Sequence, residues 1–140
     1  MWVEGVGTLT TASERRITDH LATDEITAQG LLDALVDPVR RSIVRQLAAS
    51  DSDIACGSFE INVTRSTGTH HFKVLRHAGI VRQYYVGTSK LNSLRRADLE
   101  TVAPGLIDAI LATPETARRH SPAGPGVLSG FRSEGAMSAG

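Results

Sequence analysis

The chain has few residues that cross-link or coordinate, and few aromatic ones. Cys56 is the single cysteine among 140 residues, so the chain cannot close an internal disulfide. One thiolate also supplies too few donors for a tetrahedral zinc site, and we expect neither a metal nor a cofactor. Because free cysteine is among the most buried residue types, we expect Cys56 to be a small buried side chain.

Long apolar runs are also missing. No stretch approaches the length of a membrane span, and the N-terminus has no apolar segment behind positive charge. The hydrophobic fraction of 41% is enough for one core in a domain of this length, and with 4% aromatic residues that core should be aliphatic. The sequence therefore predicts a small cytoplasmic protein that makes no contact with a membrane.

Acidic residues are absent from Ile61 to Ala97, although the whole chain has 15 acidic and 15 basic side chains. Positive charge is thus segregated within a neutral chain, which favours a polyanion as partner, and double-stranded DNA is the first candidate. The alternative is a solvated basic face without a partner. The basic residues of this block are Arg65, Lys73, Arg76, Arg82, Lys90, Arg95 and Arg96.

The block contains a predicted helix from Arg65 to Ala78. Thr64 can cap its first N–H groups, and Gly79 suits the left-handed residue that ends a helix. At helical spacing one face is apolar and includes His71, which we interpret as a packed histidine. The other face is short, polar and cationic, as expected for a helix that enters a DNA groove. Its predicted DNA contacts are Arg65, Ser66, Thr67, Thr69, His70, Lys73 and Arg76.

Two shorter helices are predicted upstream. Asp37 and Pro38 form a good start for the segment PVRRSIVRQLAAS, and Thr27–Leu35 precedes it. Between them and the basic helix, Asp51–Asn62 has room for one short helical piece and a turn. Several helices that end in a basic one favour a helix-turn-helix arrangement.

A β-hairpin is predicted directly after the basic helix, from Ile80 to Leu94, with its tip at Val86–Ser89. A hairpin in this position is a wing beside the DNA backbone, which predicts a mainly α fold of the winged helix-turn-helix class. The predicted DNA contacts in the hairpin are Arg82, Tyr84 and Lys90.

Two separated segments, ALVDPVRRSIVRQL and STGTHHFKVLRHAGIVRQ, resemble the ArsR-type winged helix-turn-helix repressors over Asp24–Leu111. The residues that match the family pattern are Ala34, Asp37, Pro38, Arg40 or Arg41, Ile43, Ser66, Thr67, His71, Val74, Leu75, Arg76, Ala78 and Gly79. The resemblance implies a homodimeric transcriptional repressor that releases its operator when an effector binds. The chain departs from the metal-sensing members, because it has one cysteine and no histidine between Asp98 and Leu111.

The C-terminal part of the domain is predicted to contain a short turn at Ala97–Thr101 and a final helix from about Pro104. Its apolar stripe could pack in the core of the subunit, but we favour a dimer interface, since a two-fold protein matches a palindromic operator. The predicted interface residues are Leu31, Leu35, Leu106, Ile107 and Ile110. The predicted divisions are an N-terminal extension (1–22, with possible helix at Ala12–Leu21), a DNA-binding domain (23–112) and a flexible tail (113–140).

Two other functions are less consistent with the sequence. A nucleophile pair of Cys56 with His70 or His71 would need an orienting acid and an oxyanion motif, and neither is visible, so we do not expect an enzyme. A winged-helix module that binds an acidic protein stays open, because fold does not fix function.

Overall fold

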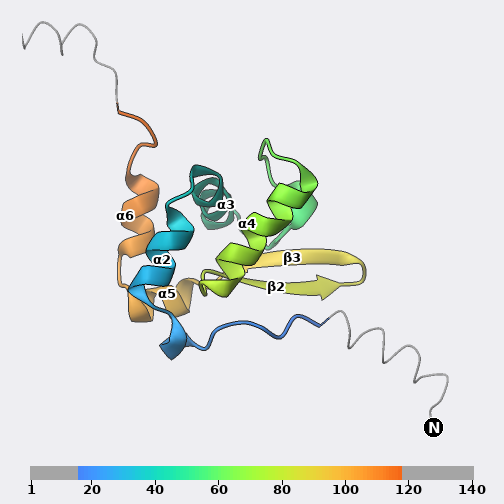
Figure 1. Cartoon of the computed structure of the whole chain (residues 1–140), viewed down its shortest axis with the longest axis horizontal. Coiled ribbons are helices and arrows are strands. Elements are labelled where there is room, and N and C mark those ends of the chain that lie inside the picture. The colour runs from blue at the N-terminus through green and yellow to red at the C-terminus, as the bar shows by residue number, and fades with distance from the viewer. Residues whose placement is uncertain (1–15, 118–140) are drawn as a thin grey trace, which may run out of the picture.

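The computed structural model describes residues 16–117. Within this range the chain forms five α-helices, two short 3-10 helices and a three-stranded antiparallel sheet, an architecture compatible with a winged helix-turn-helix (Figure 1). The elements in chain order are the 3-10 helix η1 (Thr23–Glu25), α2 (Ala28–Leu35), α3 (Pro38–Ala49), β1 (Ile54–Ala55), the 3-10 helix η2 (Cys56–Ser58), α4 (Arg65–His77), β2 (Val81–Val86), β3 (Ser89–Leu94), α5 (Arg96–Val102) and α6 (Leu106–Ala112).

Local capping fixes the beginnings of the central helices, as the sequence predicts. The Asp37 carboxylate accepts the N–H groups of Val39 and Arg40 at 2.7 and 3.2 Å at the start of α3. The Thr64 hydroxyl accepts the N–H of Thr67 at 3.2 Å at the start of α4. These contacts satisfy N–H groups that have no partner within the helix.

Gly79 ends α4 with a positive φ of 85°. Its N–H donates to the carbonyl of Arg76, and the N–H of Ile80 donates to Leu75, which together form a Schellman motif. A Cβ at this position would lie 2.5 Å from Cγ1 of the buried Ile26. The predicted glycine ending is therefore confirmed, and close packing against Ile26 adds a second requirement for glycine.

The sheet has the order β1-β3-β2. β2 and β3 form the predicted hairpin, with Val81 opposite Leu94 and Val86 opposite Ser89, so its tip lies where it was predicted. β1 was not predicted: Ile54 pairs with Asn92 of β3 in a segment expected to hold only a helical piece and a turn. The helical piece is the single 3-10 turn η2.

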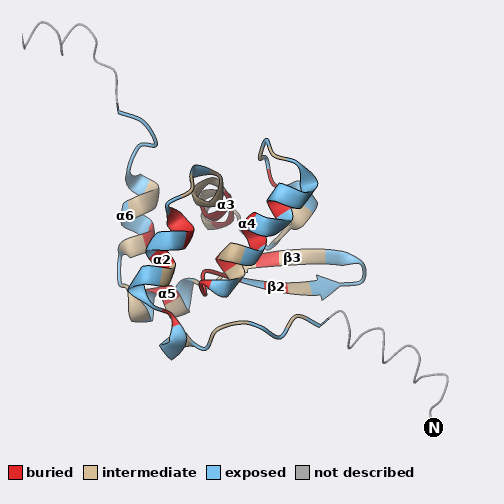
Figure 2. Ribbon diagram, viewed as in Figure 1, coloured by how far each residue is buried: buried red, intermediate tan, exposed pale blue. Residues whose placement is uncertain are grey.

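The core is aliphatic except for the ring pair Phe59 and Phe72, whose centroids are 5.1 Å apart. Figure 2 shows its buried residues where α2, α3 and α4 face one another. Ile43 and Val44 of α3 and Leu75 of α4 are inaccessible to solvent, as are Ile80 and Val81 of the segment that enters β2. This core holds the polar face of α4 outward.

Three predictions about local structure are corrected, and the predicted start of the last helix is close to the observed one. Ala97–Thr101 lies within the α-helix α5 rather than in a turn. Pro104 precedes the last helix, which begins at Leu106 after Gly105 adopts a φ of 79°. Arg16–Leu21 is not helical, and residues 12–15 of the expected helical extension lie outside the described range, as does most of the predicted tail. Cys56 is half-buried, because η2 lies at the surface.

The predicted dimer residues do not share one environment. Leu31, Leu35 and Ile107 are buried in the core of the chain and have almost no exposed surface to contribute to an interface. Leu106 and Ile110 are half-buried at its edge. The large apolar side chains exposed at this end of the domain are Leu32 of α2 and Val36 directly after it, at 57% and 71% of their full accessible area. Helical periodicity in the sequence does not distinguish the apolar residues that are buried from those that are exposed.

Gly79→Ala should lower the free energy of unfolding by about 2–4 kcal/mol, because it combines a left-handed alanine with a clash in a packed core. Gly87→Ala is the matched control, since Gly87 also has a positive φ (64°) but no atom near its Cβ position. That control should lose only about 1 kcal/mol. Urea unfolding of both variants measures the difference, and equal losses would contradict the role of Ile26.

Candidate nucleic-acid interface

α4 presents six of the predicted DNA contacts on one exposed surface. They are Arg65, Ser66, Thr67, Thr69, His70 and Lys73, all solvent-exposed. The Thr69 hydroxyl donates to the carbonyl of Arg65 at 3.0 Å, and Thr67 receives a hydrogen bond from the Thr64 hydroxyl at 2.9 Å. The two hydroxyls keep lone pairs that can accept hydrogen bonds from base edges. We call these six residues the α4 surface.

Arg76 does not belong to the α4 surface. Its side chain is only 11% exposed, and its Nη1 donates to the Oε1 of the buried Gln83 in β2. Its Nη2 donates to Asp19 of the N-terminal segment at 3.1 Å. These contacts hold α4 against the hairpin and leave little of the guanidinium exposed, which counts against the prediction that Arg76 contacts DNA.

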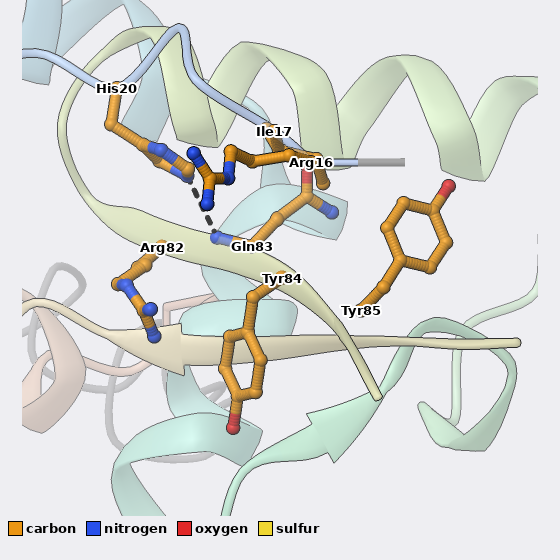
Figure 3. Close-up of a pocket in the computed structure, with 7 residues that line it drawn as sticks. All are labelled: Arg16, Ile17, His20, Arg82, Gln83, Tyr84 and Tyr85. Atoms are coloured by element: carbon orange, nitrogen blue, oxygen red, sulfur yellow. Dashed lines mark hydrogen bonds between the residues drawn. The ribbon is translucent and has the colours of Figure 1, made fainter. Parts of the chain in front are cut away.

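The hairpin divides the other predicted contacts between two faces. Alternation along β2 places Val81, Gln83 and Tyr85 toward α4, and Arg82 and Tyr84 on the opposite side (Figure 3). The Arg82 guanidinium lies 4.6 Å from the centre of the Tyr84 ring, and the Tyr84 hydroxyl donates to Asp53 beside β1. Arg82 and Tyr84 thus lie on a different face from the α4 surface.

Lys90 of β3 lies with the α4 surface instead. Its ammonium group is 5.6 Å from the centre of the Tyr85 ring, and both side chains line the same hollow as Arg65 and Thr69. Sequence reasoning missed Tyr85 and chose Tyr84. The available signal for Tyr85 was strand alternation from the apolar Val81, because Tyr85 lies four residues later and so on the same face of the strand.

The N-terminal segment packs along the free side of β2 (Figure 3). His20 Nε2 accepts the backbone N–H of Gln83 at 3.0 Å, which requires a neutral ring with its proton on Nδ1. Burial lowers the pKa of His20, and the nearby Arg76 guanidinium lowers it further. The neighbouring Asp19 bonds His77 at 2.8 Å as well as Arg76, and these contacts lower its pKa to about 2.

His71 is packed, as predicted from its place on the apolar face of α4. It is buried, and its Nδ1 lies 3.1 Å from Nη1 of Arg40, which can only donate. Burial lowers the pKa of His71, although Asp37 partly opposes this. The same Arg40 donates from Nε to the carbonyl of Ala34 at 2.6 Å, so one guanidinium joins the end of α2 to α4.

A basic helix held outward by a helical core and followed by a hairpin is typical of helix-turn-helix DNA-binding proteins. Comparison with known proteins agrees: the chain is 34% identical over 89 residues to the Bacillus subtilis (strain 168) protein YceK, described as an uncharacterized HTH-type transcriptional regulator. The match spans 62% of this chain and 88% of the relative. The chain therefore belongs to the HTH-type transcriptional regulators and is a DNA-binding transcriptional regulator.

Two further searches found no match. No protein-family model matches the sequence. Among residues 16–117, no helix is long and apolar enough to cross a membrane.

Stability should fall as the pH is lowered from 7 to 5. The pKa values of His20 and His71 are lower in the folded protein than the ordinary 6.5. As the pH falls below that value, the unfolded chain takes up protons on these histidines before the folded chain does, which stabilises the unfolded state. A variant with His20→Gln and His71→Gln should show a smaller loss, because glutamine retains an acceptor but does not titrate. Urea unfolding at both pH values tests this, and an unchanged loss in the variant would contradict it.

Proposed function

We propose that the protein is a dimeric winged helix-turn-helix repressor of the ArsR type that places the α4 surface in the major groove of a palindromic operator. The observation that carries this proposal is the composition of the α4 surface: two cations, three hydroxyls and one imidazole, with no carboxylate. Lys73 and Arg65 supply phosphate attraction, while the short polar side chains allow close approach to base edges. The wing contributes Lys90 beside the DNA backbone.

The proposed DNA-binding domain is 23–112. Its first element begins at Thr23 and its last ends at Ala112, which supports these limits. Residues on either side also pack on the domain: His20 bonds β2, and Glu115 forms ion pairs with Arg41 and Arg45 of α3 at 2.8 and 3.1 Å. A fragment made for binding studies should therefore include both flanks.

Lys73→Ala and Lys90→Ala should each weaken binding to all duplexes and reduce the slope of log K against log salt by about 0.9, the value for one phosphate contact. Ser66→Ala, Thr69→Ala and His70→Ala should instead change sequence preference, by about 1–3 kcal/mol at the affected base pair. Arg82→Ala is the matched control, because this cation lies on the other face of the sheet.

The measurement is fluorescence anisotropy over a salt series, on an operator first obtained by selecting bound fragments from the source genome. An unchanged slope for Lys73→Ala would exclude α4 from the DNA. Uniformly weak binding without a preferred sequence would favour the alternative, a winged-helix module that binds an acidic protein.

We further propose that the dimer forms through α2 and α6, with Leu32, Val36 and Ile110 at its interface. α2 and α6 lie at the end of the molecule away from the hairpin tip, so two copies joined there leave both α4 surfaces free (Figure 1). The exposed Leu32 and Val36 supply apolar area that no other described residue covers.

Leu32→Asp or Val36→Asp should produce folded monomers that lose the operator, because a charge in an apolar interface is costly and one half-site makes too few contacts. Ala97→Asp, at an exposed position in the first turn of α5, is the control and should remain dimeric. Sedimentation and circular dichroism measure assembly and helicity. Dimers that bind normally would exclude this interface, whereas Ile107→Asp should unfold the subunit, since Ile107 is buried.

A further inference from the structure

A hollow of about 520 Å³ opens between α4, η2 and the hairpin. Its lining is mixed: the apolar side chains of Phe59, Ile61, Val63 and Phe72 lie next to polar groups of α4 and the hairpin. Volumes of 300–1,000 Å³ with apolar walls and a few polar groups are typical of small-molecule sites.

The mouth of the hollow carries positive charge. Arg65 at the start of α4 and Lys90 of β3 line it from two sides, and neither forms an ion pair with any residue of the range 16–117. The acid-free block from Ile61 to Ala97 explains this, since no carboxylate lies nearby in sequence. Thr69 and Tyr85 add hydroxyl groups to the lining. A ligand that suits this lining has an anionic end and an apolar body.

We propose that this hollow binds a small organic carboxylate with an aromatic or compact aliphatic body, and that this ligand competes with DNA. The carboxylate bonds Arg65 and Lys90, and the body lies against the apolar side chains of the lining. Because Arg65, Thr69 and Lys90 are also proposed DNA contacts, the ligand neutralises part of the interface. This competition rests on the proposed function, whereas binding to the hollow does not.

Binding is tested on the full chain without DNA, with 2-naphthoate as the probe and the isosteric, neutral 2-naphthamide as its control. Calorimetry and amide chemical shifts should show naphthoate binding at least tenfold tighter, with shifts concentrated at η2, the start of α4 and the hairpin. Arg65→Gln and Lys90→Gln should each weaken naphthoate at least fivefold and leave naphthamide unchanged. Arg82→Gln should change neither.

Gly68→Ala tests the apolar part of the lining independently of charge. A Cβ at Gly68 would lie 3.7 and 3.8 Å from Val63 and Ile61, an ordinary contact, so the methyl group fits while reducing the hollow. Alanine also favours a helix interior over glycine, so the variant should be no less stable. It should bind both probes more weakly, and unfolding cannot account for that loss.

Competition is then measured on the operator. At a naphthoate concentration of ten times its own Kd, mutual exclusion raises the apparent operator Kd about tenfold for each hollow that DNA requires to be empty, and so about a hundredfold for a dimer that uses both. Naphthoate that binds no tighter than naphthamide would overturn the carboxylate site and leave the proposed DNA binding intact. Naphthoate binding with an unchanged operator Kd would overturn the competition.

Discussion

The position of α4 relative to the hairpin depends on one network of buried polar side chains. Gln83 and Asn92 face each other across β2 and β3, both inaccessible to solvent, and the Gln83 amide donates to the Asn92 oxygen at 2.8 Å. Arg76 of α4 donates to Gln83, and the Asn92 amide donates to the carbonyl of Ile54 in β1 at 3.1 Å. Buried amides without partners are costly, so these contacts specify one position of the helix over the sheet.

A second set of arginine contacts fixes the helices that support α4. The last carbonyls of α2 have no partner within the helix, and two consecutive arginines of α3 supply donors. Arg40 bonds Ala34 and reaches His71, while Arg41 donates to the carbonyls of Leu35 and Val36 at 2.7 and 3.0 Å. The DPVRR segment therefore caps two helix ends at once: Asp37 at the start of α3 and the arginines at the end of α2.

The parts of the fold that local chemistry determines could be predicted from the sequence. Thr64, Asp37 and Gly79 form their capping contacts with residues a few positions away in sequence. The helices that begin or end at these residues therefore lie close to their predicted limits. Features that depend on distant partners could not. Arg76 lies at the edge of the polar face of α4, and only the buried Gln83 turns it inward. Leu31 and Leu32 are adjacent apolar residues, and their different burial depends on α3 and the C-terminal helices.

The hollow beside α4 also depends on distant partners, because it lies between α4, the 3-10 turn η2 and the hairpin. Asp51–Asn62 forms a two-residue strand and a single 3-10 turn, which is too short to cover the first half of α4. Phe59 and Phe72 fill the deeper part of the gap, and the outer part stays open beside Arg65 and Lys90. The short connection therefore leaves apolar side chains directly beside Arg65 and Lys90, two of the cations that we propose as DNA contacts.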